Sequence, residues 1–175
     1  WLNQKKNVFC EKPLTLSYES AKELFELADS QRVALYVDDV FRWRDDLMSW
    51  LHMSKFQWSK SDNTNFIDRL AYHHFYLWTQ DRDDVEVKSV SWDLKWHSVP
   101  DMFTVSLYGG LYADFDYSRS GKTIHKINDE NVKKSKNNAL KDMLNAVIYD
   151  YEMIGGNRNS TLNAIKISEA VRKKL

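Results

Sequence analysis

Two stretches of this chain hold the residues that could do chemistry. The first is Glu11-Lys12, which follows the apolar run Val8-Phe9-Cys10 and precedes Pro13. An apolar run without alternation predicts a short buried strand, and Pro13 ends it because proline has no N–H to donate. Glu11 and Lys12 then lie at the carboxyl end of a strand, where open α/β sheets bind their ligands. The alternative is a surface ion pair at a strand end.

The second stretch is His73-His74, within a helix predicted over residues 66–79. His74 shares a stripe with Ile67, Leu70, Ala71 and Leu77, which predicts a core histidine, whereas His73 is rotated by about 100° onto another flank. Neighbouring side chains diverge on a helix, so the two imidazoles do not form a metal pair. From the residues alone, a structural role is the simpler interpretation of this pair.

The elements before these histidines predict a parallel unit. Ser17 can cap a helix whose apolar residues Ala21, Leu24, Phe25 and Ala28 follow helical spacing, and the run 33–37 predicts a second buried strand. Strand, helix and strand in this order form a right-handed parallel unit. The following Asp38–Arg44 segment is either a solvated linker with Trp43 packed on the core or part of a site containing Arg42 or Arg44.

Later residues predict a sheet. After a strand at 56–58, apolar and polar residues alternate from Val85 onward, with a hairpin signal at Gly109-Gly110 and another strand over 122–127. A loop over 128–138 precedes helices over 139–151 and from Asn159 or Ser160 to Lys173. The fold class predicted is α+β: the end of a Rossmann sheet, then a mostly antiparallel, open-faced β-sheet covered by helices on one face.

Val8–Leu14 resembles the Glu-Lys-Pro signature of the glucose-fructose oxidoreductase/inositol dehydrogenase/MocA family, written Gfo/Idh/MocA below. Its members are two-domain, NAD(P)-dependent sugar and cyclitol oxidoreductases. The match is close over Lys6–Arg44 and looser afterwards. The resemblance implies that residues 1–43 are the carboxyl-terminal part of a Rossmann-like domain and residues 44–175 a substrate-binding and dimerisation domain. Because no G-x-G-x-x-G occurs in the sequence, we expect a truncated chain, inactive alone, that lacks the phosphate-binding turn.

The resemblance also implies site residues. In the family the motif's lysine, here Lys12, lies beside the nicotinamide and the reacting carbon. Aligning Leu70-Ala71-Tyr72-His73 with the family's second signature makes His73 the catalytic histidine, with Arg69 where an aspartate is usual; a shift by one residue keeps Asp68 but places Tyr72 at the histidine position. The implied sets are catalytic Lys12 and His73; cofactor-binding Glu11, Lys12, Pro13 and Arg42; and substrate-binding Lys12, Arg69, His73 and Trp43. Neither catalytic residue is assigned to the core, so we expect their substitution to leave folding little changed.

Composition narrows the classes of function. With 25 basic and 25 acidic residues the formal net charge is +0, which does not suggest a nucleic-acid binder. One cysteine excludes an intrachain disulfide framework and a cysteine-based zinc site. No apolar run reaches a membrane span and no secretory signal is present, so we expect a cytoplasmic protein.

The expected partners are a sugar or cyclitol substrate, NAD or NADP in a full-length parent, and a second copy bound through the polar-aromatic sheet face. We expect no metal, because hydride transfer needs none. The alternative functions are a non-catalytic association domain and a ligand-binding relic that has lost catalysis.

Overall fold

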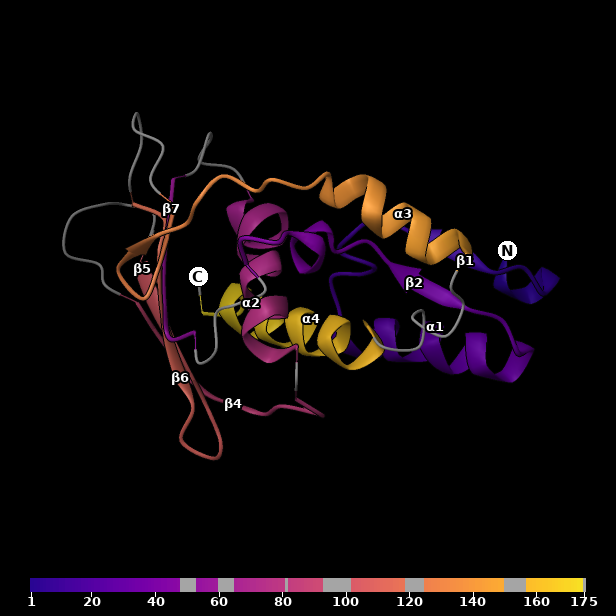
Figure 1. The fold of residues 1–175 in the computed structure, drawn as a ribbon. Coiled ribbons are helices and arrows are strands. Elements are labelled where there is room, and N and C mark those ends of the chain that lie inside the picture. Colours follow the sequence, from indigo (N-terminus) through magenta and orange to yellow (C-terminus); the bar gives the residue numbers. More distant parts are fainter. Residues whose placement is uncertain are drawn as a thin grey trace.

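The computed structural model describes residues 1–47, 53–59, 65–80, 82–92, 102–118, 125–149 and 157–174. Figure 1 shows three layers: a β-sheet at one side, helices α2 (Tyr72–Thr79) and α4 (Arg158–Arg172) packed against it, and an N-terminal strand–helix–strand unit beyond them. The middle layer thus lies between the large sheet and the N-terminal unit.

The N-terminal unit has the predicted strand–helix–strand order. After a 3₁₀ turn at Leu2–Gln4, β1 (Val8–Cys10) and β2 (Leu35–Val37) pair in parallel, with Cys10 opposite Val37. Helix α1 (Tyr18–Gln31) connects them and buries Ala21, Phe25 and Ala28. Parallel pairing places the carboxyl ends of both strands at one edge.

The large sheet has the order β4-β5-β6-β3-β7-β8. Its strands are β3 (Lys55–Trp58), β4 (Val87–Trp92), β5 (Met102–Leu107), β6 (Tyr112–Asp116), β7 (His125–Ile127) and β8 (Glu130–Asn131). The predicted mostly antiparallel sheet is confirmed, but β3 lies between β6 and β7, parallel to β6 and antiparallel to β7. β6 and β7 are therefore not neighbours in the sheet, although they follow one another in the chain; alternation identifies strands and not their partners. β8 also lies within the predicted loop 128–138.

Residues alternate between the two faces of the sheet as predicted. Phe56, Phe103, Val105 and Phe115 are at most 3% exposed on the face covered by helices. The opposite face carries polar side chains with the aromatic Tyr112, and Tyr108 at the turn beyond β5 is also exposed. The period of two thus follows from burial of one face only.

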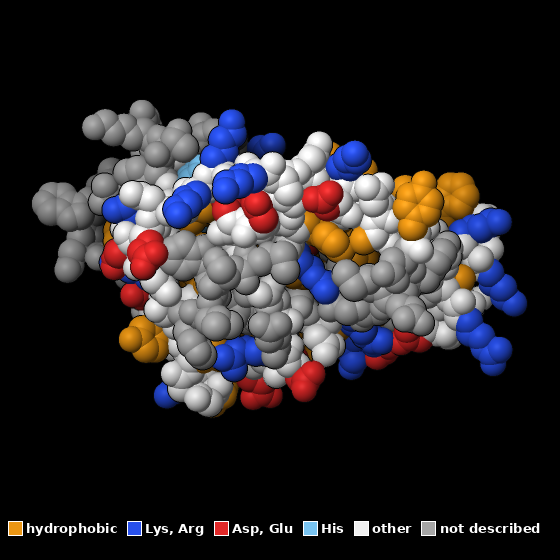
Figure 2. Space-filling model, viewed as in Figure 1, with side chains coloured by type: hydrophobic (Ala, Val, Ile, Leu, Met, Phe, Trp, Pro, Cys, Tyr) orange, Lys and Arg blue, Asp and Glu red, His pale blue; other side chains and the backbone are white. Residues whose placement is uncertain are grey.

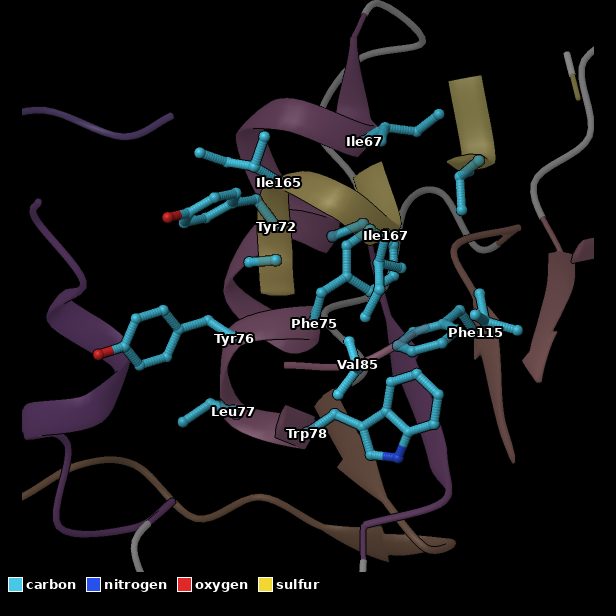
Figure 3. Packing of buried hydrophobic residues seen from close by; sticks show 14 of the residues in the cluster. Ile67, Tyr72, Phe75, Tyr76, Leu77, Trp78, Val85, Phe115, Ile165 and Ile167 are labelled. Carbon is cyan, nitrogen blue, oxygen red and sulfur yellow. The ribbon is translucent and has the colours of Figure 1, made fainter. Parts of the chain in front are cut away.

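The helix predicted over residues 66–79 has two parts. Ile67–Ala71 form a π-helical turn, η3, and α2 follows from Tyr72. Every residue of α2 is buried, so the prediction of a single buried stripe was wrong. In Figure 3 the hydroxyl groups of Tyr72 and Tyr76 point to one side of α2, whereas Phe75 and Trp78 point toward Phe115 of the sheet. A helix packed on several sides is apolar all round.

The last two helices connect the layers. α3 (Ala139–Tyr149) packs on β2 through Met143 and Val147 against Tyr36, and it leaves other apolar side chains exposed on its outer face, where Figure 2 shows hydrophobic side chains gathered. α4 begins at Arg158, earlier than either predicted cap. Its preceding residue, Asn157, is buried and donates a hydrogen bond to the carbonyl of Val37 at 2.6 Å. That bond connects the start of α4 to the end of β2.

Some expectations fall on residues that are not described. They concern residues 93–101 of the alternating stretch, residues 122–124 of the predicted strand over 122–127, and residues 150–151 of the predicted helix over 139–151. The domain boundary between residues 43 and 44 stays a prediction. Across the described ranges, no helix is long and apolar enough to span a membrane.

Candidate functional site

The turns that follow β1 and β2 lie at the same edge of their sheet. The backbone N–H of Asp38 donates to the carbonyl of Cys10 at 2.7 Å, so the residues after the two strands stay adjacent. This places Glu11 and Lys12 beside Asp38 and Asp39. The short helix η2 (Val40–Trp43) then leads away from the edge. The edge is therefore rich in charge, as ligand-binding edges of α/β sheets often are.

Lys12 reaches from this edge to η3. Its Nζ donates to the backbone carbonyl of Asp68 at 3.2 Å and to that of Arg69, and it lies 5.9 Å from the centroid of the Tyr72 ring. Burial lowers the pKa of Lys12, and the negative charges of Asp39, Glu11 and Asp38 oppose that shift. Single π-helical turns are frequent at functional sites, and here the turn presents its carbonyls to a lysine from another layer.

His73 lies next to this lysine, in a nearly dry environment. It is 7% exposed, its Nδ1 lies 3.1 Å from Oδ1 of Asp39, and its ring stacks on Phe41 with centroids 4.3 Å apart. Burial and then the charge of Lys12 lower the pKa of His73 to about 3. At neutral pH the imidazole is thus uncharged, with Nδ1 engaged and its plane held by Phe41.

Asp39 is the site residue that the sequence did not indicate. It is 0% exposed, and burial raises its pKa well above the usual range. The nearby backbone N–H groups of Phe41 and Arg42 and the positive charges of Arg42 and Lys12 oppose that rise. The available signal was positional, because Asp39 follows the second parallel strand just as Lys12 follows the first.

His74 belongs to the core, as the helical stripe predicted. It is 0% exposed, its Nδ1 lies 2.8 Å from the hydroxyl of Tyr117, and its ring packs between Phe56 and Trp58. The two adjacent histidines therefore face different layers. His73 faces the charged edge, and His74 faces the sheet.

The carboxylate of Asp68 does not contact His73. It forms an ion pair with Arg172 at the end of α4, and its side chain is 5% exposed. Tyr72, which the shifted alignment would place at the histidine position, is 0% exposed. The geometry thus brings Lys12 near His73 and commits Asp68 elsewhere.

The aromatic and basic residues of the segment after β2 have different roles. Trp43 donates from Nε1 to the hydroxyl of Tyr36 at 3.1 Å and packs in the small cluster under α3, so it is a packing residue in this arrangement. Arg42 lies close enough to Asp39 for its charge to lower that pKa. Arg44, the alternative to Arg42, pairs with Asp46 at 2.6 Å and lies over the face of Phe41, the ring that stacks on His73.

The remaining predicted residues lie around Lys12. Glu11 is exposed, and burial of Asp38 together with the charge of Glu11 raises the pKa of Asp38 to about 6. Pro13 follows Lys12 through a cis peptide bond. Arg69 is exposed, and its charge adds to the lowering of the pKa of Lys12. Among the described residues, no group of three or more His, Cys, Asp or Glu side chains could hold a metal ion.

Residues 1–39 match the family model described as the GFO_IDH_MocA oxidoreductase family with an NAD-binding Rossmann fold. An uncharacterized oxidoreductase of Schizosaccharomyces pombe is 48% identical over 48 residues, which are 27% of this chain and 13% of that protein. The match therefore covers a small part of that relative. The resemblance to this family, predicted from Glu11-Lys12-Pro13, is confirmed.

Solved structures show the same fold at low identity. UDP-N-acetylglucosamine 3-dehydrogenase from Acidithiobacillus ferrooxidans has a TM-score of 0.65 at 17% identity, covering 97% of this chain and 70% of that chain. The WlbA dehydrogenase from Bordetella pertussis, in complex with NADH and UDP-GlcNAcA, has a TM-score of 0.63 at 13% identity, covering 98% and 70%. An oxidoreductase from Agrobacterium radiobacter with NAD⁺, L-tartaric acid and magnesium has a TM-score of 0.67 at 15% identity, covering 98% and 71%.

Proposed function

We propose that this chain, a relative of the Gfo/Idh/MocA oxidoreductases in fold and in the sequence of residues 1–39, supplies the substrate side of an NAD(P)-dependent oxidoreductase. Its substrate is a sugar or cyclitol, oxidised or reduced at a CH–OH carbon. One observation carries this proposal. Lys12 and His73 come from different layers, yet both interact with Asp39, one through charge and one through a 3.1 Å contact.

Each proposed catalytic group has a chemical task. A bound nicotinamide would supply the hydride acceptor for oxidation of the substrate carbon and, in its reduced form, the hydride donor for the reverse reaction. An ammonium group has three N–H donors, and two of those of Lys12 point to the carbonyls of Asp68 and Arg69, which leaves one for the substrate oxygen. That donor stabilises the negative charge developing on the oxygen. No described residue hydrogen-bonds Nε2 of His73, so this atom takes the hydroxyl proton in oxidation and returns it in reduction.

The residues of the chain fit one end of the cofactor. The edge after β1 and β2 offers Lys12 and Arg42 to the nicotinamide and its ribose, and Glu11 and Pro13 shape the turn. A G-x-G-x-x-G turn, which holds the pyrophosphate at a helix N-terminus, does not occur in the sequence. We therefore expect residues 1–175 alone to bind NAD or NADP weakly and to be inactive.

The open sheet face supports a second proposal, that two copies pair as a homodimer. Its cross-strand polar contacts include Gln57 to Asp116 at 3.2 Å and Thr104 to Asp114 at 2.5 Å, and Tyr112 is 58% exposed beside them. Uncovered sheet faces that combine aromatic and polar groups suit isologous pairing. A non-catalytic association domain would use the same face without Lys12 or His73.

The test has two stages. Calorimetric titration of residues 1–175 with NAD⁺ and NADP⁺ should show no binding in the micromolar range. The chain is then fused to an N-terminal strand–helix segment that carries a G-x-G-x-x-G turn, and absorbance at 340 nm is followed with cyclitols, hexoses and UDP-sugars. Turnover that depends on Lys12 and His73 supports the proposal. Micromolar binding of NAD⁺ or NADP⁺ to the unfused chain would contradict the expectation of weak binding. Turnover that is unaffected by substitution of Lys12 and of His73 would contradict the catalytic roles proposed for them.

A further inference from the structure

We propose that Asp39 is the positioning residue for His73, and that the two form a buried pair through Nδ1 which leaves Nε2 as the atom that exchanges a proton with substrate. This inference rests on the proposed function for its catalytic meaning. Its structural content, the pairing of one carboxyl group with one ring nitrogen, can be measured without turnover.

Burial makes the contact specific. Oδ1 of Asp39 lies 3.1 Å from Nδ1 of His73, with side chains 0% and 9% exposed. Oδ2 of Asp39 finds no hydrogen-bond partner among the described residues. A buried carboxyl group is costly unless it is paired or hydrogen-bonded, and the contact with His73 adds a side-chain partner to the backbone N–H groups of Phe41 and Arg42 and the charges of Arg42 and Lys12. Water cannot readily replace either partner at this depth.

The second constraint on His73 is Phe41. The two rings are nearly parallel, with an interplanar angle of 10° and centroids 4.3 Å apart. Asp39 and Phe41 both belong to the segment that follows β2, so one short segment fixes both the plane of the imidazole and the partner of its Nδ1. A ring held in this way has one nitrogen available for substrate, as in the carboxylate–histidine pairs of hydrolytic triads.

No other described carboxyl group performs this task. Position 69, where the family signature predicts an aspartate, is an exposed arginine, and Asp68 is committed to Arg172. The pairing of His73 with Asp39 therefore restores, from a different element, the carboxyl partner that Arg69 removes. Sequence comparison along the helix alone would class His73 as lacking such a partner.

The pair also explains how a dry histidine can carry a proton. Alone, His73 would be a weak proton acceptor, because burial and Lys12 lower its pKa to about 3. Burial moves the pKa of Asp39 in the opposite direction, so the pair retains one proton to higher pH than His73 would alone. Two groups coupled across one contact titrate as a unit. The charged and titratable groups that face the pair are Glu11 and Lys12 after β1, Tyr36 in β2, Asp38, Arg42 and Arg44 after β2, and Tyr72, His74 and Tyr76 on α2.

The test is ¹⁵N and ¹³C NMR of the 175-residue chain with labelled histidine and aspartate. In the unsubstituted chain, the ring nitrogens of His73 and the carboxyl carbon of Asp39 should shift with one common midpoint as pH changes. Asp39→Asn should alter the tautomer of His73 and the chemical shift of its Nδ1. A carboxylate can only accept a hydrogen bond from Nδ1, whereas a side-chain amide can donate one to it. His74 is the matched control: it should respond to Tyr117→Phe and not to Asp39→Asn.

Two results would overturn the inference. One is independent titration of Asp39 and His73 in the unsubstituted chain, which needs no variant to fold. The other is an unchanged His73 spectrum in a folded Asp39→Asn chain. In the fused enzyme, Asp39→Asn should lower kcat by about 10²–10⁴-fold, the range seen when a histidine loses its orienting carboxylate, with little change in KM. If the NMR pairing holds and no substrate turns over, the proposed function fails and the pairing stands.

Discussion

The hydrogen bond between His74 and Tyr117 gives a quantitative test of which histidine belongs to the core. Both residues are 0% exposed, and His74 Nδ1 lies 2.8 Å from the hydroxyl. Tyr117→Phe removes the hydroxyl at nearly constant volume and leaves Nδ1 buried without a partner. Such an orphaned polar group costs about 1–3 kcal/mol. With a urea m-value of about 2 kcal/mol per M, the unfolding midpoint should fall by about 0.5–1.5 M.

A double-mutant cycle separates the bond from general packing. His74→Phe leaves the Tyr117 hydroxyl buried and also adds volume to a site already filled by Phe56 and Trp58. The double variant removes both polar groups, so its loss should be smaller than the sum of the single losses by about 1 kcal/mol or more. Tyr112→Phe is the matched control: Tyr112 is 58% exposed, and its hydroxyl should contribute less than about 0.5 kcal/mol.

The assay is urea unfolding at pH 7, followed by tryptophan fluorescence. Losses that add within about 0.5 kcal/mol would refute the bond. A Tyr117→Phe chain as stable as the Tyr112→Phe control would do the same. Either result would mean that the Tyr117 hydroxyl does not stabilise His74 in the folded chain.

The same histidine predicts a pH dependence of stability. Burial lowers the pKa of His74 well below its usual value, so the unfolded chain binds a proton below about pH 6.5 that the native chain does not. The stability that comes from the neutral ring is therefore complete above pH 6.5 and is lost as pH falls, by up to about 1.4 kcal/mol per pH unit. Between pH 7 and pH 5 the unsubstituted chain should lose more stability than the His74→Phe chain. An equal loss in both would contradict the assignment.

Three further predictions concern the site and the surface. In the fused enzyme, Lys12→Ala and His73→Ala should each lower kcat by about 10²–10⁴-fold. Because His73 is 7% exposed, urea unfolding should also show that His73→Ala destabilises the chain, in place of the unchanged folding that the sequence predicted. Arg172→Met should lower the free energy of unfolding by about 1–3 kcal/mol, because it leaves the carboxylate of Asp68 buried without its cation. An unchanged midpoint of urea unfolding would show that water solvates Asp68 as well as Arg172 does. Light scattering should detect a dimer that Tyr112→Arg dissociates, and a monomer at high protein concentration would refute pairing through the open face.

Much of the chain was predictable because its signals are local. The helical spacing of Ala21, Phe25 and Ala28 and the alternation in β5 and β6 each reflect one element burying one face. The run 8–10 before Pro13 forms the predicted strand, but the prediction that it is buried was wrong, because Phe9 is 41% exposed at this end of the small sheet. The sequence also identified Glu11-Lys12-Pro13, and with it the family resemblance and the strand edge, because a motif of consecutive residues does not depend on the rest of the fold. It separated His73 from His74 by helical rotation alone.

Tertiary structure decided what depends on partners distant in the sequence. Three features depend on which elements pack together: the insertion of β3 between β6 and β7, the burial of α2 on every side, and the packing of Trp43 under α3. Alternation and helical spacing do not indicate which elements will pack together. The pairing of Asp39 with His73 is of the same kind. The two residues are separated by 34 positions and come together only because β2 ends beside η3 and α2. A single sequence therefore indicates which residues can do chemistry, and packing decides which of them face one another.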